Sequence, residues 1–512
     1  MADVVAAAPG DASSAVTGVE SPGHSHPLRA MLLLGGGSGV AIVLGLVQAK
    51  VVALLIGPEG VGELALLQSL VTLAAMVAGV GLATGVVRVI GDAATVGEHA
   101  RVAAVQRAAG WTGAAGVAVV GAFLLAAAQF VARVMLGPAA GATDIACAVL
   151  AVAATVAAGV YTGVLNAYHR VRTLSLGSVV TSVLATAGTI AVVLWRGVAG
   201  VPLAVVLTAL ATLGVAYALA PREPRRLAPE SATRDAAGAL VRFGVPFTAS
   251  QLVGAGVQLV LPAVVLHRLG REAVGQYRAA AAISTAYLAL LVAAFAKDYY
   301  PRVAAARRDA GRLRTLLREQ QRLVLLIAAP LCVTFLAVAP VLVPTVYSDR
   351  FGPAVDILRW QAIGELLKFA AFSGAHVVLA RSSSRLYFAM EFVAGATLLA
   401  GSWVGVQLLG LPGLGAAYLA TYAVYFVTCA VVTRREIGGA TSPANARRLA
   451  AALGAALAVA ATRWVLPPAA RLPVSLLIAG CVCAEAAFAL LGTAELRRHA
   501  LAAVGRMRPA HR

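Results

Sequence analysis

Four ionisable side chains inside long apolar runs are the residues best placed to do chemistry in this sequence: Lys50, Glu365, Lys368 and Glu391. A charge at membrane depth costs several kcal/mol unless it faces a wet cavity or a partner. Glu365 and Lys368 lie three residues apart on one helical face, so they can neutralise each other in a structural ion pair or form part of a functional polar site. Glu391 has no charged neighbour close by in sequence. It needs a partner across a helix interface or must be protonated, which makes it a candidate coupling carboxylate.

Anion binding is the chemistry that the cations of these runs suggest. Lys50 lies deep in one apolar run, Arg88 ends another and Arg278 begins a third. Together with Lys368, they could hold an anionic group in a cleft of low dielectric constant. The alternatives are that Lys50 snorkels to the interface and that the two arginines are interfacial anchors.

Uncharged polar and aromatic residues accompany the charges on two of the runs. Gln361, Glu365 and Lys368 form a polar stripe that a helix facing lipid on all sides would not tolerate. We therefore expect Gln361 to join the two carboxylates in a polar coupling network. Tyr422 and Tyr425 could line the path of a sugar or a lipid, although aromatic residues near a membrane interface commonly act as anchors.

Sequence signals of an enzyme, a cofactor or a metal site are missing. The stretch GGGSG at Gly35–Gly39 has no following Lys-Ser/Thr, so it is not a P-loop. The five cysteines lack the spacing of a zinc site or a disulfide framework. We expect a protein that is not an enzyme and binds no cofactor or metal, with a proton or a sodium ion as the coupling ion.

Composition requires that these residues be positioned by membrane helices. Of the 512 residues, 60% are hydrophobic and 12% are charged, against about 45–50% and about 25% in soluble domains. A water-soluble globule is therefore excluded. A bilayer core of about 30 Å needs about 20 helical residues, and about fourteen apolar stretches approach that length. The expected fold is an all-α polytopic membrane protein.

A short internal repeat divides the spans into two sets of six. Ile56–Gly62 (IGPEGVG) aligns with Leu269–Gly275 (LGREAVG), each in the turn after the first span of a set. An even number of spans per copy gives both copies the same orientation, related by a pseudo-two-fold axis along the membrane normal. The expected parts are a disordered cytoplasmic tail at 1–30, an N-terminal six-helix lobe at 31–220, a cytoplasmic linker at 221–242, a C-terminal six-helix lobe at 243–433, an extra helix pair at 434–491 and a basic cytoplasmic tail at 492–512.

Loop charges set the orientation. The net charge is +19, and about thirty of the 41 Lys and Arg residues fall in loops of one side. That side is assigned to the cytoplasm, which places both termini there and explains the basicity without a nucleic-acid partner.

Five stretches carry a resemblance to a known family. They are K-x-x-A-x-x-x-G-P-x-G-x-G from Lys50 to Gly62, AYL around Tyr287 with Pro301 following, W-Q-x-x-G-x-x-L-K from Trp360 to Lys368, R-x-Y-x-x-x-E from Arg385 to Glu391, and G-L-G-A-A with A-T-Y-x-V-Y-F from Gly413 to Phe426. In order and spacing the chain resembles Wzx-type flippases of the multidrug/oligosaccharidyl-lipid/polysaccharide exporter superfamily, and most closely the branch that moves the enterobacterial common antigen lipid intermediate.

The resemblance implies a MATE-like transporter of the bacterial inner membrane. Such a protein carries an undecaprenyl-diphosphate-linked oligosaccharide to the periplasmic leaflet by alternating access, for O-antigen or common-antigen biosynthesis. Its cationic cavity would use Lys50, Arg88, Arg278 and Lys368, and Tyr287 would border the glycan or lipid path. Thr285 stands where related sequences often have an acidic residue, and the last helix pair exceeds the twelve spans of the closest branch. Membrane lipid is a partner, and the sequence leaves open whether a polysaccharide polymerase or chain-length protein is another.

Three other functions remain as alternatives. A cation-coupled multidrug extruder of the same superfamily would have acidic sites in the first lobe, and the spans of that lobe have almost none. A membrane-embedded glycan polymerase would carry a large outer loop with catalytic residues, whereas every expected outer loop is short. A structural scaffold has no use for costly buried charges.

Overall fold

The chain forms a bundle of long helices. The computed structural model describes residues 27–96, 98–138, 140–168, 171–221, 229–381, 384–439 and 441–506, and all regular secondary structure in those residues is helical. The N-terminal helices are α1 (Pro27–Gly79), α2 (Leu82–Val96), α3 (His99–Ala126), α4 (Ala128–Val131), the π-helical turn η1 (Ala132–Leu136), α5 (Ala142–Ala167), α6 (Val171–Arg196), the 3-10 turn η2 (Gly197–Gly200) and α7 (Val201–Leu219). The rest are α8 (Glu230–Ala305), α9 (Ala310–Val346), the 3-10 turn η4 (Asp349–Phe351), α10 (Ala354–Arg381), α11 (Ser384–Leu409), α12 (Pro412–Ile437), α13 (Pro443–Val465) and α14 (Pro468–Arg506).

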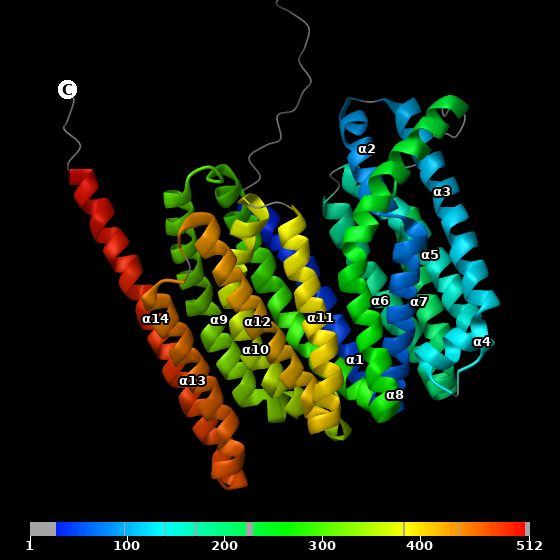
Figure 1. Ribbon diagram of the computed structural model, residues 1–512. Coiled ribbons are helices and arrows are strands. Elements are labelled where there is room, and N and C mark those ends of the chain that lie inside the picture. Colours follow the sequence, from blue (N-terminus) through cyan, green and yellow to red (C-terminus); the bar gives the residue numbers. More distant parts are fainter. Residues whose placement is uncertain are drawn as a thin grey trace, which may run out of the picture.

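The helices gather in two groups. Figure 1 shows α2–α7 on one side of the molecule and α9–α14 on the other, while α1 and α8 contact helices of both groups. The pair α13 and α14 lies at the outer edge of the second group and packs against α9 (Figure 1).

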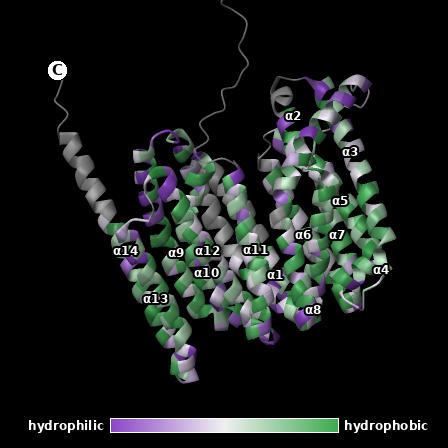
Figure 2. Cartoon of the chain, in the orientation of Figure 1, coloured by the Kyte–Doolittle hydropathy of each residue, from purple (hydrophilic) through white to green (hydrophobic). Residues whose placement is uncertain are grey.

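Length and hydropathy identify a multi-pass membrane protein. Ten helices in the described residues are long and apolar enough to cross a bilayer, or eleven with the bent pair Glu230–Ala249 and Gly254–Ser284. Hydrophobic residues dominate the middle of the bundle and hydrophilic residues collect at its ends (Figure 2). One of the ten, Thr173–Leu219, comprises 47 residues and contains two of the fourteen expected spans, because α6 and α7 fold back on each other at η2 and bring Thr189 Oγ1 within 3.4 Å of Thr208 Oγ1. The segment Val43–Gly79 comprises 37 residues and is broken at Gly57.

Both copies of the sequence repeat break their helix at the same glycine. In α1, Gly57 has φ 64° and ψ −170°, and in α8 the aligned Gly270 has φ 86° and ψ 177°. Only glycine adopts such angles without strain. The residue that follows is Pro58 in the first copy but Arg271 in the second, so glycine rather than proline is the feature common to the two breaks.

The two copies also pack against each other reciprocally. Gly62 lies against the backbone of Arg271, and Gly275 lies against the backbone of Pro58. Pro58 aligns with Arg271 and Gly62 aligns with Gly275, so the same contact is made twice. A Cβ on either glycine would overlap the facing backbone, which explains why small residues recur at these two positions.

An ion pair secures one side of this crossing. Arg271 donates to Glu63 Oε2 at 2.9 Å, and both side chains are mostly buried. Its Nε and Nη2 donate to the carbonyl oxygen of Leu136 at 3.2 and 2.9 Å. In the second copy Gln276, which aligns with Glu63, instead donates to the carbonyl oxygen of Arg350 at 2.8 Å.

Helices extend into two segments that the sequence assigned to non-helical regions. The interval expected as a linker, 221–242, is helical from Glu230 because α8 begins there after Pro229. The tail expected from 492 continues α14 to Arg506. Residues 1–26, most of the expected N-terminal tail, lie outside the described residues.

Candidate functional site

The polar stripe of α10 lies in the most enclosed membrane-crossing helix. In α10, 83% of the most apolar window is buried, more than in any other of the ten candidate spans. Glu365 is 1% exposed. Its Oε1 accepts from Ser284 of α8 at 3.1 Å, from Lys368 at 3.4 Å and from the hydroxyl of Tyr418 of α12. The carboxylate thus joins three helices in the interior of the bundle.

Lys368 is the cation of this cluster. Its Nζ forms the ion pair with Glu365 and donates to Tyr418 Oη at 3.1 Å. It also lies 5.1 Å from the ring centroid of Tyr422, within cation–π distance. Glu365 and Lys368 thus form the ion pair that their spacing allows, and Lys368 Nζ already has partners in this structure. Neutralisation is the cheaper state for two charges held three residues apart on a buried face.

Two acceptors in the cluster have no donor. Neither Glu365 Oε2 nor Gln361 Oε1 has a hydrogen-bond partner in the described part of the chain, and Gln361 is 2% exposed. The two residues are four apart, so they lie on the same face of α10. A pair of buried, unsatisfied oxygens is costly unless a proton, a cation or water meets them.

The second carboxylate finds its partner across a helix interface. Glu391 of α11 accepts a hydrogen bond from Tyr425 Oη of α12 at 2.7 Å. A partner across a helix interface was one of the two alternatives that the sequence left for Glu391. Along α12 the rings of Tyr418 and Tyr422 lie 4.7 Å apart, and those of Tyr422 and Tyr425 lie 6.2 Å apart. A ladder of three tyrosines therefore runs from Glu365 to Glu391.

Two members of this network were missed by sequence reasoning. Tyr418, Tyr422 and Tyr425 recur at the i, i+4, i+7 spacing of one helical face, and that spacing is a signal that could have identified Tyr418. Ser284 offers no such signal, because a lone serine in an apolar helix is commonplace and its contact with Glu365 depends on tertiary packing.

The three remaining cations lie apart from the Glu365–Lys368 pair. Lys50 of α1 donates to the carbonyl oxygen of Pro344 in α9 at 3.1 Å. The Arg88 guanidinium lies 4.8 Å from the Phe243 ring centroid, and the side chain is exposed. Arg278 is half-buried and has no hydrogen bond or ion pair with the described residues. It precedes Ser284 on α8 by six residues, about 9 Å of helical rise.

One proposed path residue is not described. The side chain of Tyr287 lies outside the described residues, as does that of Thr285.

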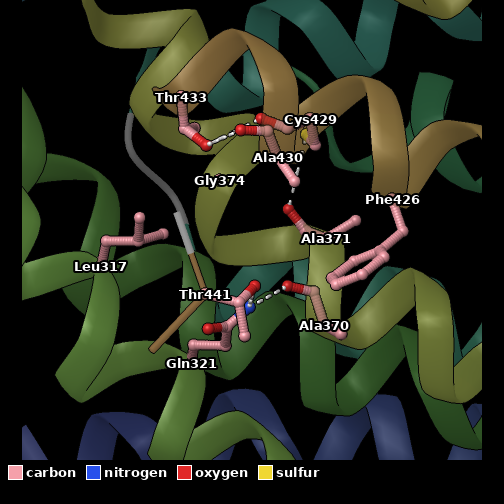
Figure 3. Close-up of a pocket in the computed structure, with 10 residues that line it drawn as sticks. All are labelled: Leu317, Gln321, Ala370, Ala371, Gly374, Phe426, Cys429, Ala430, Thr433 and Thr441. Atoms are coloured by element: carbon pink, nitrogen blue, oxygen red, sulfur yellow. Dashed lines mark hydrogen bonds between the residues drawn. The ribbon is translucent and has the colours of Figure 1, made fainter. Parts of the chain in front are cut away.

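A small void between α9, α10 and α12 is not a substrate site. Figure 3 shows Gln321 of α9 pointing to α10, where its Nε2 donates to the carbonyl oxygen of Ala370 at 2.9 Å and also to Thr441 Oγ1 at 3.0 Å. The void has a volume of about 10 Å³, enough for at most one water molecule. The void lies where α9, α10 and α12 meet, and it is too small to be a substrate site.

Solved transport proteins share the fold. The lipid II flippase MurJ in an inward closed conformation superposes with a TM-score of 0.68, covering 89% of this chain and 98% of that chain at 10% identity. A multidrug resistance MATE family transporter of the MOP superfamily, in an inward-facing conformation, superposes with a TM-score of 0.60 over 80% of this chain and 94% of that chain at 16% identity. At these identities the likeness establishes the fold, which confirms the expected MATE-like architecture.

Curated sequences are also similar over part of the chain. The lipid III flippases of Escherichia coli (strain K12) and Shigella flexneri are each 28% identical over 160 residues. Those residues make up 31% of this chain and 38% of each relative, so the match spans less than half the length of these relatives. This chain is a distant relative of lipid III flippases, as the five motifs predicted.

A family model covers more than half of the chain. The model described as polysaccharide biosynthesis protein matches residues 51–356. The chain therefore belongs to the family of polysaccharide biosynthesis proteins.

Proposed function

We propose that this protein is a flippase for an undecaprenyl-diphosphate-linked oligosaccharide, which it moves from the cytoplasmic to the periplasmic leaflet by alternating access. The observation that carries the proposal is the polar network of Glu365, Lys368 and Tyr418 inside the most buried membrane-crossing helix of a transporter fold. A helix that only spans the bilayer gains nothing from such a network, because its members must be desolvated. Membership of a polysaccharide biosynthesis family favours a lipid-linked glycan over a drug as cargo.

The substrate headgroup requires cations that are free to bind it. Arg278 is the strongest candidate, because its half-buried guanidinium has no hydrogen-bond or ion-pair partner in the described residues. An arginine fork matches two phosphate oxygens, and the interaction is strong where water is scarce. Lys50 can contribute after it leaves the Pro344 carbonyl oxygen, and Arg88 after it leaves the Phe243 ring. Lys368 serves best as the counter-ion of Glu365. Tyr287, Tyr422 and Tyr425 then border the path of the glycan or lipid.

The coupling ion is a proton or a sodium ion bound at the α10 network. Support comes from Glu365 Oε2 and Gln361 Oε1, two buried acceptors on one helical face without a donor. Glu391, linked to them through the tyrosine ladder, is the second coupling carboxylate.

The proposed architecture has fourteen spans in the bacterial inner membrane with both termini in the cytoplasm. It consists of two six-helix lobes, 31–220 and 243–433, with the α10 network in the second lobe, and the pair within 434–491 is an accessory element. The shared helix breaks at Gly57 and Gly270 and their reciprocal packing support this two-fold relation. A polysaccharide polymerase or chain-length protein would act on the product outside.

The test is transfer of a fluorescent undecaprenyl-diphosphate oligosaccharide across liposomes that contain the purified protein. The comparison is between wild type, Arg278→Gln and Glu391→Gln, each with and without a pH gradient. Arg242→Gln is the matched control, because Arg242 is an exposed arginine on the same helix. Loss of one charged hydrogen bond to the headgroup, about 1.5–3 kcal/mol, predicts that transfer by Arg278→Gln falls about tenfold or more.

The outcomes separate the functions. Transfer without a gradient that is reduced only in Arg278→Gln, together with a response to the gradient only when Glu391 is intact, supports the coupled flippase. Absence of lipid transfer by the wild type, with uptake of a cationic dye instead, would favour the multidrug extruder.

A further inference from the structure

A large cavity lies within the first group of helices, away from the α10 network. It has a volume of about 1140 Å³ and is bounded by α3, α5 and the end of α7. Ligand sites in proteins commonly occupy about 300–1,000 Å³, so this cavity is large enough for a lipid chain. None of the predicted site residues lines it.

The cavity exists because the facing helices carry small side chains. Ala103, Gly110 and Ala114 project from α3, opposite Ala153 and Ala157 of α5. Protein interiors normally pack to crystal-like density, so side chains this short leave the space between the helices unfilled. An empty space beside these alanine, glycine and valine residues forfeits dispersion contacts, and that part of the lining offers water few hydrogen bonds.

Polar groups mark one end of the cavity. Arg107 and Gln106 of α3 line it, and Gln106 Nε2 donates at 3.1 Å to the carbonyl oxygen of Pro221, just past the end of α7. Trp111 is 69% exposed beside them, as is typical of an aromatic residue at the level of lipid headgroups. The lining therefore changes from basic and aromatic to apolar along α3.

The two helices that form most of the cavity wall are candidate membrane spans that are largely exposed on the protein surface. His99–Ala126 and Ala142–Ala167 are both candidate membrane spans, and only 28% and 44% of their most apolar windows are buried in the protein. We propose that the cavity binds an anionic phospholipid, with an acyl chain along α5 between α3 and α7 and the phosphate on Arg107. A guanidinium at the mouth of a pocket between helices recognises an anionic headgroup. The basic end faces the side that loop charges assign to the cytoplasm, so the lipid comes from that leaflet.

Lipid retention by the purified full-length protein tests this assignment. The protein in detergent is titrated with phosphatidylglycerol, phosphatidylethanolamine or a synthetic polyprenyl diphosphate, and bound lipid is counted by native mass spectrometry. Gly110→Leu adds a bulky side chain to the cavity lining, at a position where an added Cβ meets no atom within 4 Å. Gly214→Leu is its matched control, since Gly214 on α7 is equally open but lies outside the cavity lining.

The headgroup is tested in parallel. Arg107→Gln is compared with Arg101→Gln, which removes an exposed arginine of the same helix that does not line the cavity. Retention of phosphatidylglycerol is expected to fall about fivefold in Arg107→Gln, the equivalent of about 1 kcal/mol. In Gly110→Leu it is expected to fall about tenfold, with both controls unchanged.

Three results would overturn the proposal: equal retention of the zwitterionic and anionic phospholipids, unchanged retention in Gly110→Leu, or displacement of phosphatidylglycerol by polyprenyl diphosphate. The last result would assign the cavity to the tail of the transport substrate. Flippase activity is not measured, so failure here leaves the proposed function standing.

Discussion

Alanine at Gly275 should loosen the contact between α1 and α8. A Cβ at this position would lie 2.7 Å from the carbonyl carbon of Pro58, whereas carbon atoms rest about 3.5–4.0 Å apart. The two helices must therefore separate by about 1 Å, and overpacking of this kind costs about 1–3 kcal/mol. Gly62→Ala should act in the same direction, because it meets the backbone of Arg271 in the reciprocal contact.

The same free energy changes the fraction of molecules in which α1 and α8 are in contact. If α1 and α8 separate when the transporter changes state, about 1–3 kcal/mol corresponds to about a 5–150-fold shift toward the open state. Val61 is 8% exposed next to the crossing. A cysteine in place of Val61, in a protein without its native cysteines, should react with a membrane-impermeant maleimide several-fold faster when Gly275→Ala is added.

Gly238→Ala is the matched control for both measurements. Gly238 lies on α8, and a Cβ there meets no atom within 4 Å. Thermal unfolding followed by intrinsic fluorescence should show a lower midpoint for Gly275→Ala than for Gly238→Ala. Equal midpoints together with equal labelling rates would refute the argument that this close approach holds the two helices together.

Three further substitutions test the buried polar contacts. Lys368→Met leaves the Glu365 carboxylate without its counter-ion and should destabilise the protein by about 3–5 kcal/mol in denaturant unfolding. Adding Glu365→Gln should restore most of the lost stability. Absence of this rescue would contradict the ion pair between Glu365 and Lys368. Tyr425→Phe removes the donor to Glu391 and should cost about 1–3 kcal/mol, measured against Tyr300→Phe at an exposed position. Arg271→Met should lower the unfolding midpoint more than Arg268→Met does, and equal midpoints would argue against a stabilising role for the ion pair at the crossing.

Much of the fold followed from the sequence because a bilayer imposes a simple rule. Helices must satisfy their own backbone and present about 20 apolar residues to lipid, and all regular secondary structure in the described residues is helical. The helix break was predictable in position, since Gly57 and Gly270 occupy equivalent turns. The turn between α6 and α7 was equally predictable, because the glycine-containing segment Gly197–Gly200 forms a single 3-10 turn at which the two helices fold back on each other.

The candidate site was predictable where partners are close in sequence. Glu365 and Lys368 were paired correctly because three residues separate them on one helix. The partner of Glu391 lies on another helix. The sequence therefore indicated only that Glu391 needs a partner or a proton, and it could not identify Tyr425. The cavity beside Arg107 could not be foreseen, because alanine and glycine carry no chemistry of their own and the space between them depends on how the helices are spaced.

The crossing of α1 and α8 has the geometry of a homodimer interface, in which one surface meets its own copy about a two-fold axis. Its chemistry is not symmetric, because Arg271 faces Glu63 on one side whereas the equivalent pair on the other side is Pro58 and Gln276. Two first halves would set proline against glutamate, and two second halves would set arginine against glutamine, so neither pairing forms the ion pair. The single charge pair thus makes the correct partner for each half the other half of the same fold, and it disfavours assembly of like halves from neighbouring chains during membrane insertion.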